Sequence, residues 1–175
     1  MKRMKKLLTG LLTLGMTLSM MTMTAFAAGP TTGTTEKMPT IDFDVNKTGS
    51  ITIHKYEYNG TDGVTGTGAD NQTPPTGAEP LAGVTFKITK IAELNDYYGT
   101  DAKAFPTVEQ AKTMTSIGTP IVQITDENGE AKFNNLSLGL YLVQETDAPA
   151  QITGKVGDFL VSIPMTNADE DDWLY

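Results

Sequence analysis

Two charged residues occupy strand positions whose neighbours on the same face are apolar. Lys55 follows Ile51 and Ile53 at the two-residue period of a β-strand, and Glu145 follows Val143 in the same way. If both faces line one core, an amine and a carboxyl group meet inside it. Burial favours the uncharged amine and the protonated acid. A neutral amine can attack a carboxamide while the acid moves the proton, so the pair predicts nucleophilic chemistry with general acid–base assistance.

A purely structural role for these two residues is the alternative. Lys55 lies near the end of its predicted strand, where its side chain can extend to water. Glu145 can pair with the lysine or cap the turn that begins at Asp147. The only histidine, His54, lies on the opposite face from Lys55 by alternation, which predicts a solvated strand residue rather than a catalytic base or a metal ligand.

The acidic run over residues 169–172 is the remaining cluster of candidate ligands. It lacks the spaced oxygen donors and the turn glycine of a calcium loop, so it predicts a solvated connection between strands. We therefore expect neither a metal nor a cofactor. A secreted hydrolase with paired carboxylates is disfavoured as well, because the single tryptophan, Trp173, does not frame an acidic pair.

The elements that must position Lys55 and Glu145 are short β-strands separated by turns. A hairpin is predicted around the Asn-Gly turn at residues 128–129, and a short helix at residues 107–114 with Thr107 as its N-cap. This pattern favours an all-β, immunoglobulin-like antiparallel sandwich with one helix in an insertion. The predicted strands cover residues 49–56, 84–91, 121–124, 130–133, 140–145 and 159–163.

Residues 1–27 have the features of a secretory signal peptide. Four basic residues precede an apolar run over residues 7–23, and Ala25 and Ala27 supply the small residues of a cleavage site. We expect cleavage after Ala27, which places the rest of the chain outside the cell.

The exported part is acidic and contains no cysteine. We expect an exposed lead over residues 28–48 and one domain over residues 49–175. The first 27 residues hold four of the 13 basic and none of the 21 acidic residues, so the remainder has a net charge of −12. Such a chain repels nucleic acid and anionic membrane surfaces. Because cysteine is absent, any covalent reinforcement must use other chemistry.

Three segments together resemble the N-terminal domain of the major shaft pilins of Gram-positive bacteria, which are SpaA-like and built on the Cna protein B-type fold. Residues 49–56, 80–86 and 139–149 carry the resemblance, with the Asn-Gly pair at 128–129 before the third. Trp173 and Tyr175 resemble the opening of that family's pilin motif. The resemblance implies that the polymerising lysine and the final strand lie beyond Tyr175, so we expect a fragment.

The resemblance also implies a reaction for the buried pair. It implies an intramolecular isopeptide bond between Lys55 and an asparagine, promoted by Glu145, with loss of ammonia. Asn167 is the nearest candidate acceptor, but it follows the strand that we take as the penultimate one. In the family the acceptor lies on the final strand, so the true acceptor is expected after Tyr175.

A structural subunit of a cell-surface pilus is therefore the first hypothesis, and an enzyme is not expected. The resemblance implies export, polymerisation by sortase with other pilin subunits, attachment to the cell wall, and adhesion to host surface proteins or glycans. The alternative is a ligand-binding module of a non-polymerising, wall-anchored adhesin that uses its insertions at 59–80 and 92–120. A continuation of the gene into Val-x-Val-Tyr-Pro-Lys-Asn would favour the pilin.

Overall fold

A computed structural model describes most of the predicted domain. The described residues are 41, 44, 46–57, 73–74, 76–98, 102–150, 152, 155–166 and 172–175. The predicted signal peptide, with Ala25 and Ala27, lies outside them, as do most of the predicted lead and Asn167.

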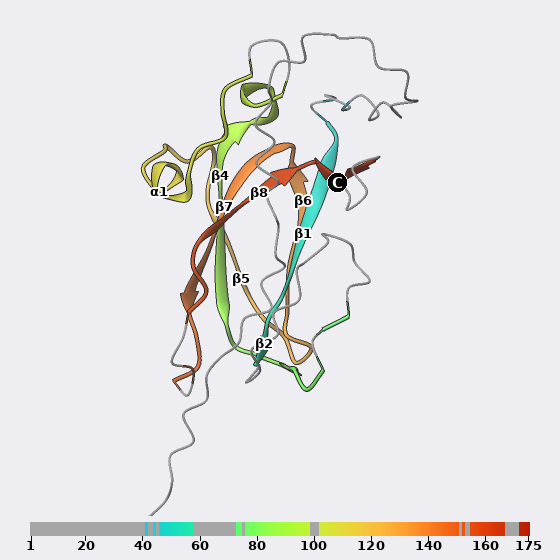
Figure 1. The fold of residues 1–175 in the computed structure, drawn as a ribbon, viewed down its shortest axis with the longest axis vertical. Helices are drawn as coiled ribbons and strands as arrows, with labels where there is room; N and C mark the ends of the chain where they lie inside the picture. The colour runs from blue at the N-terminus through green and yellow to red at the C-terminus, as the bar shows by residue number, and fades with distance from the viewer. Residues whose placement is uncertain are drawn as a thin grey trace, which may run out of the picture.

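The described chain is mostly antiparallel β-strand, as Figure 1 shows. Its largest sheet has the strand order β5-β4-β7-β8, while β1 pairs with β6, β2 with β3, and β9 with β10. The elements are β1 Thr48–His54, β2 Tyr56–Glu57, β3 Glu79–Pro80, β4 Thr85–Glu93, the 3-10 helix η1 Leu94–Asp96, α1 Val108–Ala111, β5 Ile121–Ile124, β6 Glu130–Ser137, β7 Gly139–Asp147, β8 Phe159–Ile163, β9 Met165–Thr166 and β10 Trp173–Leu174.

The main core lies between the β1–β6 pair and the four-stranded sheet. Alternate residues of each strand point into it, as the two-residue period predicts: Val84, Phe86 and Ile88 are at most 1% exposed, whereas the intervening side chains reach water. Ile53 of β1 and Phe133 of β6 belong to the same buried cluster. Each large side chain buried in this way contributes roughly 1.5–3 kcal/mol to folding.

A second apolar cluster covers the outer face of the same sheet. Leu140 and Leu142 of β7 pack there with Leu160 of β8 and with residues of the η1–α1 segment, among them Tyr97 and Ala111. Figure 1 shows α1 on one side of the sheet and β1 with β6 on the other. β7 is therefore buried on both faces, and the η1–α1 segment packs as a cover over the sheet.

The predicted helix is confirmed, although it is shorter than expected. Thr107 is its N-cap: the Thr107 side chain accepts a hydrogen bond from the Gln110 backbone N–H, and the Gln110 side chain accepts one from the Thr107 N–H. The helix ends at Ala111 after a single turn. Within the described part of the chain, no helix is long and apolar enough to cross a membrane.

The predicted hairpin around residues 128–129 is wrong. The turn itself forms, because the Gly129 N–H donates to the Asp126 carbonyl and Gly129 takes a φ of 74°. However, β5 pairs with β4 and β6 pairs with β1, so the turn carries the chain from one sheet to the other. The pairing with β1 lets β6 bury its alternate apolar residues in the main core, which a hairpin with the exposed edge strand β5 would not do.

Candidate functional site

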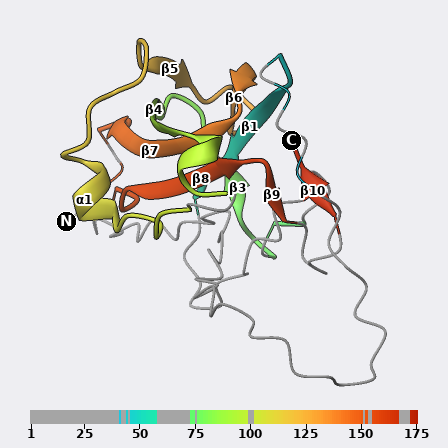
Figure 2. The same ribbon diagram turned by 90° about the horizontal axis from the view of Figure 1, so that it is seen from above.

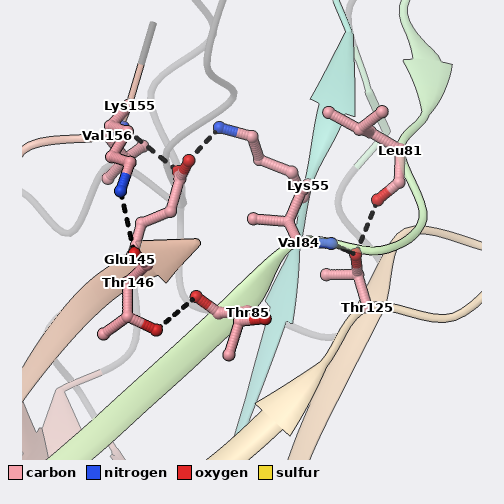
Figure 3. Close-up of polar contacts among 9 residues, drawn as sticks. All are labelled: Lys55, Leu81, Val84, Thr85, Thr125, Glu145, Thr146, Lys155 and Val156. Atoms are coloured by element: carbon pink, nitrogen blue, oxygen red, sulfur yellow. Dashed lines mark hydrogen bonds and ion pairs between the residues drawn. The ribbon is translucent and has the colours of Figure 1, made fainter. Parts of the chain in front are cut away.

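Lys55 and Glu145 lie side by side in the interior. Lys55 Nζ is 2.9 Å from Glu145 Oε2, and the two side chains are 1% and 0% exposed. Figure 3 shows them reaching toward each other from the end of β1 and from β7. The two residues are 90 positions apart in sequence, so their contact joins distant segments of the chain.

The backbone of Lys55 is held on both sides of its peptide. Its N–H donates to the Gly129 carbonyl over 2.7 Å, and its carbonyl accepts from the Leu81 N–H over 2.9 Å. Because Ile51 and Ile53 on the same face are buried, the strand directs the Lys55 side chain into the core rather than to water. The alternative prediction, that the Lys55 side chain extends to solvent, is therefore wrong.

Only one of the two carboxylate oxygens of Glu145 has hydrogen-bond partners among the described residues. Its Oε2 accepts from Lys55 Nζ and from the Val156 backbone N–H at 3.1 Å, as drawn in Figure 3. Its Oε1 is buried and has no hydrogen-bond partner in the described part of the chain. Such buried polar atoms are rare because each one loses its hydration without compensation. Oε1 can therefore receive an N–H from a further group, or donate a proton to one when the acid is protonated.

A buried ion pair is weak evidence for stability by itself. Removing two charges from water costs several kcal/mol per ion, and apolar residues of similar size often serve as well. The burial of the Lys55–Glu145 pair is therefore not accounted for by a gain in stability alone.

Thr125 is linked to the backbone of Lys55 through Leu81. This role was not predicted from the sequence. The Thr125 hydroxyl donates to the Leu81 carbonyl at 2.7 Å and accepts from the Val84 N–H at 2.9 Å (Figure 3). Leu81 in turn donates its N–H to the Lys55 carbonyl. The four residues are thereby linked by hydrogen bonds. A threonine directly after a strand carries no signal in sequence that separates this role from an exposed one.

Thr125→Val is expected to destabilise the domain by about 1–3 kcal/mol, because the buried Val84 N–H loses its acceptor without a replacement. Thr125→Ser retains the hydroxyl and should cost less than Thr125→Val. Urea unfolding of the two variants checks this, and equal losses would show that the hydroxyl is unimportant.

His54 is half-buried, with Nδ1 3.6 Å from Glu130 Oε1. Among the described residues, no three His, Asp or Glu side chains are grouped so that they could hold a metal ion. Most of the acidic run at 169–172 lies outside those residues.

Trp173 and Tyr175 lie by the start of β1, away from the strand end that precedes Lys55. The Trp173 ring meets the Tyr98 ring edge-on at 5.7 Å, and Lys47 Nζ lies 3.6 Å from the centre of the Tyr175 ring. Figure 2 shows β10 beside β9 at this end of the molecule. The structure therefore does not bring the two aromatic residues onto the Lys55–Glu145 pair.

The described residues thus form an antiparallel β-domain in which a buried amine–acid pair joins distant segments. Comparison with known proteins gives the class of the domain. Residues 46–175 match the family described as Gram-positive pilin subunit D1, N-terminal domain, and the chain belongs to this family. It is a pilus subunit domain of the Gram-positive cell surface, and the predicted resemblance is confirmed.

Individual relatives are fimbrial proteins. The chain is 36% identical over 141 residues to fimbrial subunit type 1 of Actinomyces viscosus, covering 78% of this chain and 26% of that protein. It is 31% identical over 155 residues to fimbrial subunit type 2 of Actinomyces naeslundii, covering 77% and 29%. The full-length major pilin SpaD of Corynebacterium diphtheriae aligns with a TM-score of 0.60 and 36% identity, covering 77% and 31%. The chain thus spans about a quarter to a third of these relatives, which are structural subunits rather than enzymes.

Proposed function

We propose that the domain is a covalently cross-linked, load-bearing unit of a pilus shaft, with an immunoglobulin-like sandwich of the Cna protein B type. The observation that carries the proposal is the buried contact between Lys55 and Glu145, with Glu145 Oε1 left without a partner. A carboxamide that reaches Oε1 lies beside the amine that can attack it.

The reaction joins Lys55 to an asparagine side chain. Glu145 first takes the extra proton of the paired Lys55 ammonium; Nζ, now the free amine, attacks the carboxamide carbon, and a new C–N bond forms. Glu145 takes a proton from the attacking amine and passes it to the departing nitrogen, which leaves as ammonia when the old C–N bond breaks. The products are one isopeptide bond and one ammonia, which carries away the extra proton as ammonium, so Glu145 ends as the carboxylate that it was at the start. The reaction occurs once per molecule.

Such a bond adds stability by restricting the unfolded chain. A cross-link between Lys55 and a distant residue closes a long loop, as a disulfide does, and typical disulfides contribute about 2–4 kcal/mol. In a chain without cysteine, an amide serves the same purpose and is not reduced. The link also carries tension directly between two segments of the fold.

The longer parent protein is exported, its signal peptide is cleaved after Ala27, and sortase joins it to other pilin subunits and to the cell wall. Membership of the pilin family supports this assignment, as does the acidic, cysteine-free composition. Host surface proteins or glycans are its proposed external ligands. The adhesin alternative is weakened because the η1–α1 part of the second insertion packs on the sheet.

Intact mass tests the proposal. A form of the protein that continues beyond Tyr175 should be about 17 Da lighter than its sequence requires, owing to the lost ammonia. Lys55→Ala or Glu145→Ala should restore the full mass. Lys155→Ala is the matched control, because this exposed lysine donates to the Thr146 carbonyl and, among the described residues, has no contact with Lys55 or the Glu145 carboxylate; this variant should still lose about 17 Da. Full mass in the unsubstituted protein would exclude the bond.

A further inference from the structure

We propose that Asn128 is a self-modification site, which stays unreactive while the turn over residues 126–130 packs against Lys55 and reacts when that turn opens. The chemistry is cyclisation of the asparagine side chain onto the next backbone nitrogen, followed by addition of water. It uses neither Glu145 nor any residue beyond Tyr175, so it is separate from the proposed cross-link. The position is important because the same turn supplies the carbonyl that accepts from the Lys55 N–H.

The residue pair at 128–129 favours this reaction. Asn128 is exposed, and Gly129 has no side chain that keeps its backbone nitrogen away from the asparagine carboxamide. The Gly129 nitrogen attacks Asn128 Cγ, and the new C–N bond closes a succinimide ring. The side-chain nitrogen leaves as ammonia, which takes up the proton that the Gly129 nitrogen lost. Water then opens the ring at either carbonyl, and aspartate or isoaspartate remains at position 128.

The hydrogen bonds of the native turn oppose the first step. The Gly129 N–H donates to the Asp126 carbonyl over 2.9 Å, and a nitrogen without its proton would be repelled by that oxygen. Asp126 Oδ1 accepts from the N–H groups of Asn128 at 2.9 Å and of Glu130 at 3.0 Å. The Glu130 and Asn128 N–H groups lower the pKa of Asp126, so the turn carries a negative charge that disfavours loss of the Gly129 proton.

Packing against Lys55 keeps the turn in place. Gly129 is buried, and its carbonyl accepts from the Lys55 N–H over 2.7 Å. A Cβ atom at residue 129 would clash with the Lys55 carbonyl oxygen and would lie 3.0 Å from the Leu81 nitrogen, so the turn fits closely against both residues. Cyclisation therefore requires the turn to separate from Lys55. The rate of the reaction should follow the population of the opened turn.

The isoaspartate product prevents the turn from resuming this packing. Its main chain runs through the former side chain, which adds a carbon atom to the backbone before Gly129 and displaces the carbonyl from the Lys55 N–H. We expect the isolated isoaspartate form to unfold at a lower urea concentration than the unmodified chain. Asn128→Asp is the matched control, because it adds the same charge without lengthening the backbone, and it should unfold closer to the unmodified chain. Equal midpoints for the two forms would refute the coupling to Lys55.

The ammonia losses of the two reactions are distinguishable, although each makes the chain lighter by about 17 Da. Hydroxylamine cuts the backbone at a succinimide and leaves an isopeptide bond intact. Asn128→Ala should abolish the cut at residue 128 and keep the cross-link. Glu145→Ala should abolish the cross-link and keep the cut. A cut at residue 128 in a chain that never forms the cross-link would refute the proposed function and support the modification site.

Two variants of Asp126 test the role of the turn. Asp126→Ala removes the acceptor for the Asn128 and Glu130 N–H groups, and it should speed the reaction in buffer about fivefold or more. Asp126→Asn keeps an oxygen acceptor and should react more slowly than Asp126→Ala. Glu127→Ala is the control, since it removes a carboxylate from the same turn but none of these hydrogen bonds. An unchanged rate in a folded Asp126→Ala chain would refute the role of the turn.

The decisive experiment compares the unsubstituted chain, shown by circular dichroism to be folded in buffer, with the same chain in guanidinium chloride. A second Asn-Gly pair, at residues 59–60, lies outside the described residues and serves as a reference for the chemistry. In guanidinium chloride, hydroxylamine should cut both pairs at similar rates. In buffer, the cut at residue 128 should be at least about tenfold slower than in guanidinium chloride. Equal rates at residue 128 in the two solutions, or a cut only at residue 59 in guanidinium chloride, would overturn the proposal.

Discussion

Lys55→Met is expected to destabilise the chain that has not formed a cross-link by about 3–5 kcal/mol. The substitution keeps most of the side-chain volume but leaves the Glu145 carboxylate buried without its cation. Oε1 already lacks a partner in the described part of the chain, and Oε2 would keep only the Val156 N–H. Few single substitutions in this domain should cost more, because most of the loss is the cost of an unpaired buried charge.

The matched control is the double variant Lys55→Met, Glu145→Gln. Glutamine removes the charge and still offers an oxygen to Val156, so the double variant should recover most of the stability lost by Lys55→Met. Urea unfolding, followed by circular dichroism, measures both free energies. If the two variants lose the same free energy, the buried charge is not the cause. If Lys55→Met loses less than about 1 kcal/mol, the pair is exposed to water in solution.

Gly129→Ala is expected to cost about 2–5 kcal/mol. Residue 129 has a φ of 74°, which is unfavourable for a residue with a Cβ. The new atom would also lie 2.3 Å from the Lys55 carbonyl oxygen and 3.0 Å from the Leu81 nitrogen. The turn must move away from β1, and the Lys55 backbone loses the carbonyl that accepts from its N–H.

Gly118→Ala separates the cost of a positive φ from the cost of the steric clash. Gly118 has a φ of 76°, but its Cβ would meet nothing within 4 Å, so it carries the conformational cost of about 1–2 kcal/mol without the clash. Gly129→Ala should therefore lose at least about 1 kcal/mol more than Gly118→Ala. In a longer, cross-linking form, Gly129→Ala should also slow ammonia loss, whereas Gly118→Ala should not. Equal effects on stability would mean that the turn adapts without moving Lys55.

The local period of the strands was sufficient to place Lys55 and Glu145 in the interior. Alternation decides which face a side chain shares, and apolar neighbours such as Ile53 and Val143 identify that face as the buried one. The N-cap at Thr107 was predictable for a similar reason, because capping depends on residues only three positions apart. The family was identifiable because several short segments occur in a fixed order.

The partner of each strand was not predictable in the same way. The Asn-Gly turn at 128–129 correctly predicted a reversal, but a turn does not state whether the strands that it joins share a sheet. The burial of β7 on both faces depends on the η1–α1 segment, whose apolar residues are far away in sequence. Thr125 gained its role only because Leu81 and Val84 fold against it.

The sequence by itself thus determined the β-class of the domain, the inward faces of its strands and the identity of the buried amine and acid. Only the tertiary structure decided that the amine and the acid lie 2.9 Å apart and that one carboxylate oxygen lacks a described partner. The physical reason is range: backbone geometry repeats every two residues along a strand, whereas strand pairing and hydrogen-bond satisfaction depend on segments brought together from across the chain.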